Sequence, residues 1–237
     1  MDLLYHQLVC IMIKCIIFDI DDTLLDHYRG YYESMEYLKY FLRVNSYVEK
    51  QYNFSYFIDE YNNLNNSLWR EFENGSINID QIIKRRFIYI FEVFNVEKKH
   101  RAIFERIFLK TYIKNCNIIG EWDKILGEFY NLGLSMIICS NGLKSIQLEK
   151  LHFTSISGFF SSFYFGTSNP NCKPNKIFYE NILNENNLKP EEVIMVGDNY
   201  ENDIVPCQLL NMKTLHFSKK EDFSFIKSLL IGMINEK

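Results

Sequence analysis

Apolar and polar positions follow two different patterns along this chain, and the first is a series of short apolar runs. Buried parallel strands are apolar on both faces. We expect such strands at residues 16–18, 134–139, 163–165, 193–196 and 213–217. Helical spacing predicts helices at residues 122–131, 143–151, 175–187, 201–211 and 222–234. Alternating strands and helices form right-handed βαβ units, so we expect an α/β fold with a Rossmann-like, doubly wound parallel sheet.

The second pattern covers residues 27–116, where apolar residues recur at helical spacing without strand punctuation. Two such stripes are Tyr37, Leu38, Phe41 and Leu42, and Phe87, Ile90, Phe91 and Phe94. The sequence Asn74-Gly75-Ser76 interrupts the pattern and is typical of a turn between helices. The segment is too long for a loop, so we expect an insert of about four or five helices.

These patterns divide the chain into a core and an insert. We expect a core of residues 12–26 and 117–237, with residues 27–116 as an inserted helical cap. Met12 directly precedes the first strand, so residues 1–11 are expected to be an extension that the fold does not need. Residues 3–18 could pass for a leader or anchor, but polar residues interrupt them and they lack a basic start. We therefore expect no targeting segment.

Composition supports a folded, cytoplasmic protein. The chain is 47% hydrophobic, with 20 Phe, 16 Tyr and only 4 Pro, which argues against disorder. The formal net charge of −4 provides no attraction for a nucleic acid polymer or an anionic membrane. The 6 cysteines are scattered without a C-x-x-C pair, which favours buried free thiols in a reducing compartment over disulfides or zinc.

The first candidate chemistry is a carboxylate cluster directly after the first predicted strand. Asp19 and Asp21 are two residues apart, so in an extended chain both side chains point to the same side. Like charges this close repel each other unless a cation lies between them or one carboxylate holds a proton. A hard cation such as Mg²⁺ suits this arrangement. The alternative is a solvated acidic turn that caps the next helix.

Further polar residues follow the other predicted strands. Ser140 and Asn141 end the second strand, Lys173 lies in a later loop, and Asp198 and Asp203 follow the fourth strand. Each of these sites alone is typical of an ordinary turn, solvated loop or helix cap. In open α/β sheets, however, ligands bind at the carboxyl ends of the strands. The shared position of these residues therefore predicts one site.

In this order, the residues resemble the motifs of the haloacid dehalogenase superfamily of phosphohydrolases. The four motifs stand here as Asp19-Ile20-Asp21-Asp22-Thr23, as Ser140 before Asn141-Gly142, as Lys173-Pro174, and as Gly197-Asp198-Asn199-Tyr200-Glu201-Asn202-Asp203. The resemblance covers nearly the whole chain. It implies hydrolysis of a small-molecule phosphomonoester by a monomer or homodimer.

The resemblance also implies catalytic roles. Asp19 is the expected nucleophile, which attacks phosphorus and forms an aspartyl-phosphate. Asp21 is expected to protonate the leaving oxygen and then to take a proton from the hydrolytic water. Lys173 offsets the charge that develops during the reaction, while Ser140 and the backbone N–H of Asn141 bind phosphate oxygens.

The implied cofactor is Mg²⁺. Its expected ligands are the carboxylates of Asp19 and Asp198 and the backbone carbonyl of Asp21. Thr23 and Asp203 are expected to support this site, Asp203 through the metal's water shell or through Lys173.

The predicted insert resembles the type 1 α-helical cap of this superfamily. Its residues 68–77 and Arg85-Arg86-Phe87, with the Ser-Asn-Gly form of the second motif and the run of residues 173–176, resemble a housecleaning pyrimidine 5′-nucleotidase branch. Trp69 would then stack on a base and Arg86 would bind a polar edge or phosphate. The alternative places Trp69 in the cap core and Arg86 on the surface.

Other functions remain open at this point. The nearest alternative is a capped phosphatase for a sugar phosphate or an acyl-sugar phosphate. A 2-haloacid dehalogenase would need no metal and would lack the second aspartate of the first motif, so Asp21 and Asp198 argue against it. A phosphomutase would need cap groups that the sequence does not identify. An inactive binding protein is disfavoured because Asp19, Asp21 and Asp198 are costly to retain without a metal.

Overall fold

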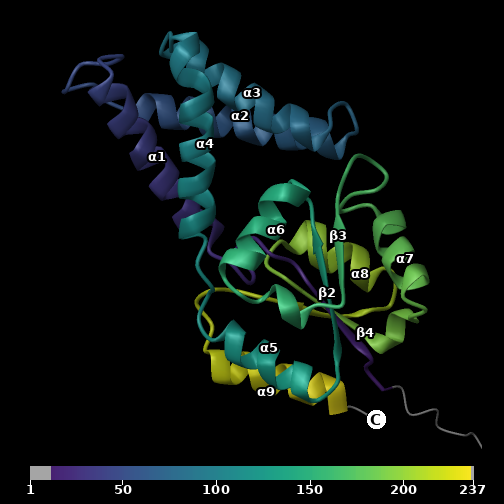
Figure 1. The fold of residues 1–237 in the computed structure, drawn as a ribbon. Coiled ribbons are helices and arrows are strands. Elements are labelled where there is room, and N and C mark those ends of the chain that lie inside the picture. The colour runs from purple at the N-terminus through teal and green to yellow at the C-terminus, as the bar shows by residue number, and fades with distance from the viewer. Residues whose placement is uncertain (1–11, 236–237) are drawn as a thin grey trace, which may run out of the picture.

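The structure, a computed structural model, describes residues 12–235, so the expectation for residues 1–11 lies outside the described residues. The described chain contains a parallel five-stranded sheet (Figure 1), which confirms the predicted fold class. In order across the sheet its strands are β3 (Ser162–Phe165), β2 (Ser135–Ser140), β1 (Cys15–Phe18), β4 (Val193–Gly197) and β5 (Lys213–His216).

The central strand β1 brings the expected site residues to one edge of the sheet. All four of its residues are buried, as expected for a strand with apolar neighbours on both faces. Phe18 pairs with Ile138 of β2 and with Val196 of β4. Asp19 therefore leaves the sheet next to the ends of β2 and β4, where Ser140 and Asp198 lie.

Helices cover both faces of the sheet. One face packs against α5 (Trp122–Asn131), α6 (Lys144–Phe153) and α9 (Phe223–Asn235). The other face packs against α7 (Lys176–Glu185) and α8 (Val205–Gln208). Short 3₁₀ turns at Ser157–Phe159 and Pro190–Glu192 precede β3 and β4. Figure 1 shows α5 and α9 side by side at the end of the core farthest from the insert.

The segment after β4 differs from the prediction. We expected one helix over residues 201–211, but the chain forms a π-helical turn, Tyr200–Ile204, followed by the four-residue α8. Pro206 explains the difference, because its ring has no N–H to donate to the preceding turn. Single π turns are frequent at functional sites, and this one carries Asp203.

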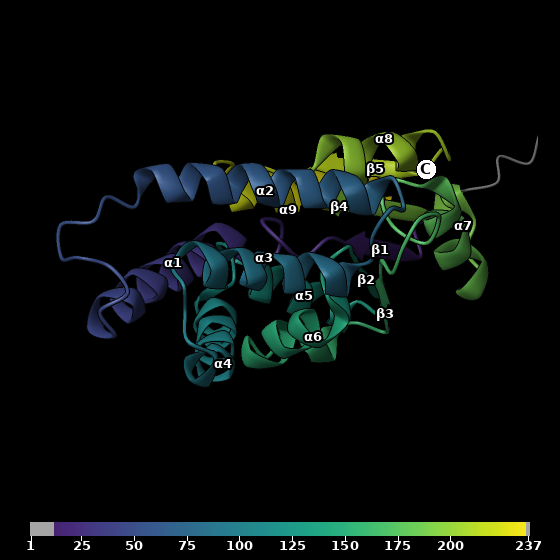
Figure 2. The same cartoon turned by 90° about the horizontal axis from the view of Figure 1, so that it is seen from above.

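The insert consists of α1 (His27–Val44), α2 (Ser55–Glu73), α3 (Ile79–Val93) and α4 (Lys98–Asn115). Its own core is strongly aromatic and contains the predicted stripes, including Phe41, Phe87 and Phe91. In Figure 2, α2 and α3 run side by side across the molecule. The insert therefore has a hydrophobic core separate from that of the sheet, although the exact domain limits stay a prediction.

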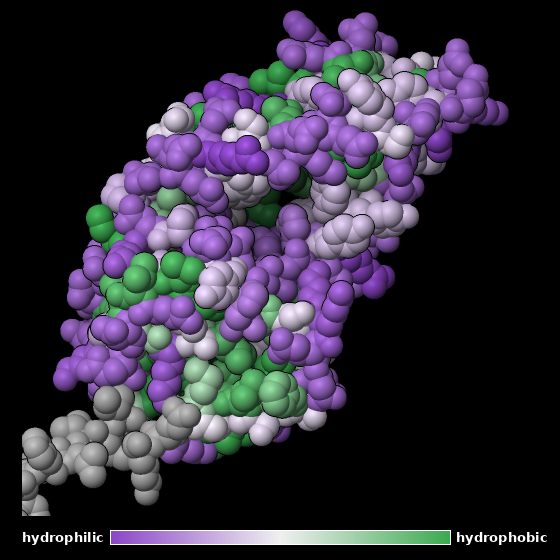
Figure 3. Space-filling model, turned by 180° about the vertical axis from the view of Figure 1, so that it is seen from behind, coloured by the Kyte–Doolittle hydropathy of each residue, from purple (hydrophilic) through white to green (hydrophobic). Residues whose placement is uncertain are grey.

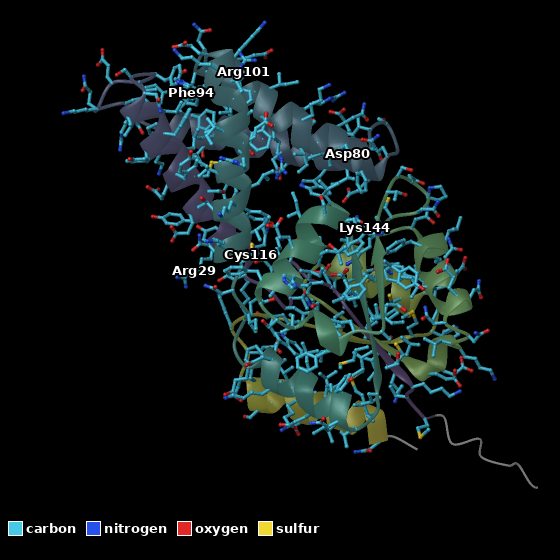
Figure 4. All side chains as sticks on the ribbon, viewed as in Figure 1. Arg29, Asp80, Phe94, Arg101, Cys116 and Lys144 are labelled. Atoms are coloured by element: carbon cyan, nitrogen blue, oxygen red, sulfur yellow. The ribbon has the colours of Figure 1, made fainter. Side chains whose placement is uncertain are left out.

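The two chain segments that join insert and core pair with each other. The backbone N–H of Asp26 donates to the carbonyl of Asn117 at 2.8 Å, and that of Ile119 donates to the carbonyl of Leu24 at 2.9 Å. Figure 4 labels Arg29 and Cys116, which lie on the insert side of these crossings. This pairing anchors α1 and α4 beside the end of β1, which Asp19 follows.

The far end of the insert also reaches the core. The turn between α2 and α3 lies against the loop before α7, where Asn169 Nδ2 donates to the carbonyl of Glu73 at 2.8 Å. Cys172 of the same loop packs with Leu68 and Ile77. Figure 3 shows the surface hollowed between the insert and the core. Contacts at both ends thus leave a space between the two parts.

Candidate active site

Three carboxylates converge at the carboxyl edge of the sheet. Asp19, Asp198 and Asp203 each have an oxygen within 4.8 Å of the others. Lys173 Nζ lies 2.6 Å from Asp19 Oδ1 and 2.6 Å from Asp203 Oδ1. Asp19, Asp203 and Lys173 are buried, and Asp198 is half-buried. The structure thus brings together residues from three of the predicted motifs.

Asn141 positions the loop that carries Lys173. Its side-chain Nδ2 donates to the carbonyl of Lys173, and its Oδ1 accepts the N–H of Lys173, both at 2.9 Å. Asn141 therefore has a side-chain role that we did not expect from the sequence. Its backbone N–H stays the predicted phosphate contact.

Close packing at Gly197 explains the spacing of the last motif. A Cβ at Gly197 would lie 2.3 Å from Asp203 Oδ2, so a larger residue would displace this carboxylate. The backbone N–H of Asn199 donates to the same oxygen at 3.1 Å. The π-helical turn thus folds Asp203 back against the end of β4.

Electrostatics at the cluster favour a cation. Burial raises the pKa of Asp19 well above its usual range, against the lowering effect of Lys173. Burial, together with Asp203 and Asp22, raises the pKa of Asp198 to about 6. One lysine thus faces three carboxylates, and hard carboxylate oxygens are what Mg²⁺ prefers. The residues present therefore fit a divalent cation.

Thr23 and Ser140 occupy supporting positions beside the cluster. Thr23, fully buried, donates from its hydroxyl to Asp198 Oδ1 at 3.2 Å. Ser140 is 2% exposed, and its Oγ accepts hydrogen bonds from the backbone N–H of Gly142 at 3.0 Å and from Gln147 Nε2 at 2.9 Å. With both acceptor positions occupied, the Ser140 hydroxyl keeps its own hydrogen to donate.

The side chain of Asp21 is directed away from the carboxylate cluster, towards α6. Its Oδ1 lies 2.5 Å from Lys150 Nζ, and its Oδ2 accepts from Gln147 Nε2 at 2.6 Å. Burial opposes its charge, but Lys150 and His27 outweigh that effect and lower the pKa of Asp21 to about 2. Because this side chain points away from the cluster, the predicted metal ligand of Asp21 is its backbone carbonyl oxygen.

Sequence reasoning missed four polar residues around Asp21. Gln147 and Lys150 come from α6, while His27 and Tyr112 come from the insert. Lys150 Nζ lies 2.7 Å from the Tyr112 hydroxyl, which lies 2.6 Å from His27 Nδ1. The available signal was weak: Gln147 and Lys150 lie one turn apart on α6, where Leu151 is the only apolar residue buried with them.

A cavity of about 380 Å³ connects this site to the insert. Its core side includes Asp19, Ser140 and Lys173, and its insert side includes the predicted Trp69 and Arg86. Both insert residues are half-buried rather than core or fully exposed. Trp69 packs edge-on against Phe72, with ring centroids 5.7 Å apart, and Arg86 Nη1 donates to Asn65 Oδ1 at 3.1 Å. The structure therefore places both side chains on the wall of the cavity.

The fold and this site define a class of protein: a hydrolase with a Rossmann-like core, an acidic site after the first strand and a helical insert over it. The family model "Haloacid dehalogenase-like hydrolase" matches residues 16–217, and the chain belongs to this family. The intact aspartates of its motifs make it a member of the phosphatase type.

The individual proteins that this chain resembles share less than a third of its residues. The chain is 24% identical over 194 residues to the pyrimidine 5′-nucleotidase PynA of Streptococcus pneumoniae, covering 81% of this chain and 78% of that protein. It is 28% identical over 213 residues to a glyceraldehyde 3-phosphate phosphatase of Methanocaldococcus jannaschii, and the match covers 88% of this chain and 86% of that protein. The magnesium-bound crystal structure of the HAD-hydrolase YfnB from Bacillus subtilis matches with a TM-score of 0.74 at 18% identity. The match covers 93% of this chain and 99% of that chain. This structural likeness shows the shared fold.

Of the described helices, none has the length and apolar character needed to cross a membrane.

Proposed function

We propose that this protein is a Mg²⁺-dependent 5′-nucleotidase that acts on pyrimidine nucleoside monophosphates through an aspartyl-phosphate. The observation that carries the proposal is the cavity that joins the catalytic carboxylates to Trp69 and Arg86. Its volume of about 380 Å³ is within the range of small-molecule sites. The similarity to PynA supports the choice of substrate. As part of this proposal, the protein is cytoplasmic and is a monomer or a homodimer.

Asp19 is the nucleophile of the proposed reaction. One oxygen is held by Lys173, which fixes the carboxylate and offsets negative charge as the phosphoryl group approaches. Attack forms the bond from Asp19 to phosphorus and breaks the bond to the leaving oxygen. The Ser140 hydroxyl, with its hydrogen free to donate, and the N–H of Asn141 bind phosphate oxygens.

Asp21 serves as acid and then as base. The neighbouring Lys150 keeps its carboxylate ionised before substrate binds, and a phosphate dianion beside it would raise its pKa and favour a proton. Asp21 then gives that proton to the leaving oxygen, and later accepts one from the water that hydrolyses the aspartyl-phosphate.

Asp19 and Asp198, with the carbonyl of Asp21, would hold Mg²⁺, while Thr23 and Asp203 keep these carboxylates in place. When bound, the metal supplies Lewis-acid stabilisation of the phosphate oxygens.

Metal affinity should depend on pH through Asp198. Its pKa is raised to about 6, so at pH 5 most molecules must lose a proton to bind the metal, whereas at pH 7.5 few must. We expect Mg²⁺ to bind at least about tenfold more weakly at pH 5 than at pH 7.5. Titration of the melting temperature with Mg²⁺ at both pH values measures this effect. Equal affinities would contradict the raised pKa.

The substrate proposal is tested by phosphate release from a panel of phosphomonoesters, with Mg²⁺ and with EDTA. The panel comprises UMP, dUMP, dTMP, purine monophosphates, sugar phosphates, glyceraldehyde 3-phosphate and p-nitrophenyl phosphate. Mg²⁺-dependent preference for pyrimidine monophosphates would support the proposal. Preference for the sugar or triose phosphates would favour the second candidate, a phosphatase for small sugar phosphates, which the similarity to the Methanocaldococcus jannaschii enzyme supports.

Trp69→Ala should separate base recognition from chemistry. If the indole stacks on a base, the variant should raise KM for UMP about tenfold, because base–aromatic stacking is worth about 1–3 kcal/mol, and should leave KM for p-nitrophenyl phosphate nearly unchanged. The matched control is Tyr56→Ala on the same helix, whose side chain is 72% exposed. Equal changes for both substrates would make Trp69 a packing residue.

A further inference from the structure

Helix α6 places two buried polar side chains against the proposed acid–base residue. Gln147 and Lys150 are each 1% exposed and lie one turn apart. Lys150 Nζ bonds Asp21 Oδ1, and Gln147 Nε2 bonds Asp21 Oδ2. Because each oxygen of the carboxylate has its own donor, rotation about its Cβ–Cγ bond would break both contacts. One helix thus sets the orientation of Asp21.

Gln147 also connects Asp21 to the phosphate-binding serine. Its Nε2 lies 2.6 Å from Asp21 Oδ2 and 2.9 Å from Ser140 Oγ, so one amide group spans both. The bond to Ser140 occupies an acceptor position and helps to leave the hydroxyl hydrogen for a ligand. A Cβ at Gly142 would lie 2.0 Å from Gln147 Nε2, so a larger residue at that position would displace the amide.

The amide of Gln147 retains an unsatisfied atom. Its Oε1 is buried and has no hydrogen-bond partner among the described residues. Burying such a carbonyl without a partner costs stability, so stability alone does not account for a glutamine here. An unsatisfied group of this kind points to a functional reason for the glutamine.

Lys150 is held from the insert as well as from the core. Its Nζ lies 2.7 Å from the Tyr112 hydroxyl and 4.5 Å from the centroid of the same ring. Tyr112 belongs to α4 and contacts His27 at the start of α1. These contacts fix the ammonium group, which in turn fixes Asp21.

We infer that Gln147 and Lys150 are positioning residues for phosphoryl transfer, which hold the Asp21 carboxylate towards the leaving oxygen and direct the Ser140 hydroxyl towards the phosphate. The inference rests on the roles proposed for Asp21 and Ser140. In the step concerned, Asp19 bonds to phosphorus, the bond to the leaving oxygen breaks, and the proton of Asp21 passes to that oxygen. Misplacing Asp21 therefore slows the cleavage of substrates whose leaving oxygen needs the proton.

The test compares phenyl phosphate with p-nitrophenyl phosphate, because the pair has nearly the same shape but phenolate is the far more basic leaving group. For each variant we compare kcat/KM, which includes ester cleavage but not the later hydrolysis of the aspartyl-phosphate. Lys150→Met and Gln147→Met are each expected to raise the preference for p-nitrophenyl phosphate roughly tenfold, a part of the about 10²–10⁴-fold effect of general acid catalysis. Lys150→Arg, which keeps a donor, should restore part of the wild-type ratio.

Lys144→Met is the matched control. Lys144 is an exposed lysine at the start of the same helix (Figure 4), and its replacement should leave the ratio unchanged. Gln147→Met should in addition raise the inhibition constant of inorganic phosphate several-fold, because the Ser140 hydroxyl is no longer oriented. If Lys150→Met fails to fold, as judged by its melting transition, Gln147→Met carries the test.

Asp21→Asn distinguishes a failure of the proposed acid role of Asp21 from a failure of the positioning role of Gln147 and Lys150. If Asp21→Asn leaves the substrate ratio unchanged, the proposed acid role of Asp21 is wrong. If Asp21→Asn raises the ratio but Lys150→Met and Gln147→Met do not, the positioning inference is overturned. If Asp21 is the acid and Lys150 positions it, adding Lys150→Met to Asp21→Asn should not change the substrate ratio any further, because the lysine acts through Asp21.

Discussion

Asp19→Asn is expected to abolish Mg²⁺-dependent phosphate release, with a fall in kcat of at least about 10⁴-fold. The amide keeps the shape of the side chain but is not a nucleophile, so no aspartyl-phosphate forms. The fold should survive. Burial raises the pKa of Asp19 well above its usual range, which means that the ionised carboxylate destabilises the folded state at neutral pH. In EDTA the variant should therefore melt at the wild-type temperature or above it.

Two measurements check this result. Acid-quenched mass spectrometry should detect phosphorylated protein for the wild type during turnover and none for Asp19→Asn. The matched control is Asp22→Asn, three residues along the same segment, whose carboxylate pairs with Lys219 at 2.5 Å instead of joining the catalytic cluster. This control should keep near-normal turnover. A substantial residual rate in Asp19→Asn would show that the reaction does not pass through that residue.

The fold was predictable because its signals are local. Apolar runs specified all five strands to within about two residues, and the alternation with helices specified a parallel sheet. The edge that carries Asp19, Ser140 and Asp198 follows from parallel pairing alone. The error at residues 201–211 has a local cause too, since Pro206 was visible in the sequence.

The surroundings of Asp21 were less predictable because their contacts join distant segments. Lys150 is 129 residues from Asp21 along the chain, and its buried position depends on the docking of α6 against α4. A lysine in a helix is usually solvated, so its sequence alone does not indicate a buried ion pair. The same holds for Asn141, whose side chain positions Lys173 through a loop 32 residues away.

Lys173→Met is expected to remove both activity and much of the stability. Lys173 is 2% exposed and its ammonium group bonds Asp19 and Asp203, so its loss leaves three neighbouring carboxylates without a cation. Breaking a buried ion pair from one side costs about 3–5 kcal/mol. We expect the free energy of unfolding in EDTA at pH 8 to fall by about that amount, with Mg²⁺ restoring part of it. Urea denaturation measures both.

The pH dependence of this loss separates charge from packing. Without the lysine, the pKa values of Asp19 and Asp198 lie further above their unfolded values, so the folded state binds protons that the unfolded state has already released. Stability of the variant therefore falls as pH rises from about 4, and its deficit should be smaller at pH 5 than at pH 8. Lys176→Met, at an exposed lysine opening α7, should show neither effect. A deficit equal at both pH values, unrelieved by Mg²⁺, would mean that Lys173 contributes packing rather than charge to this site.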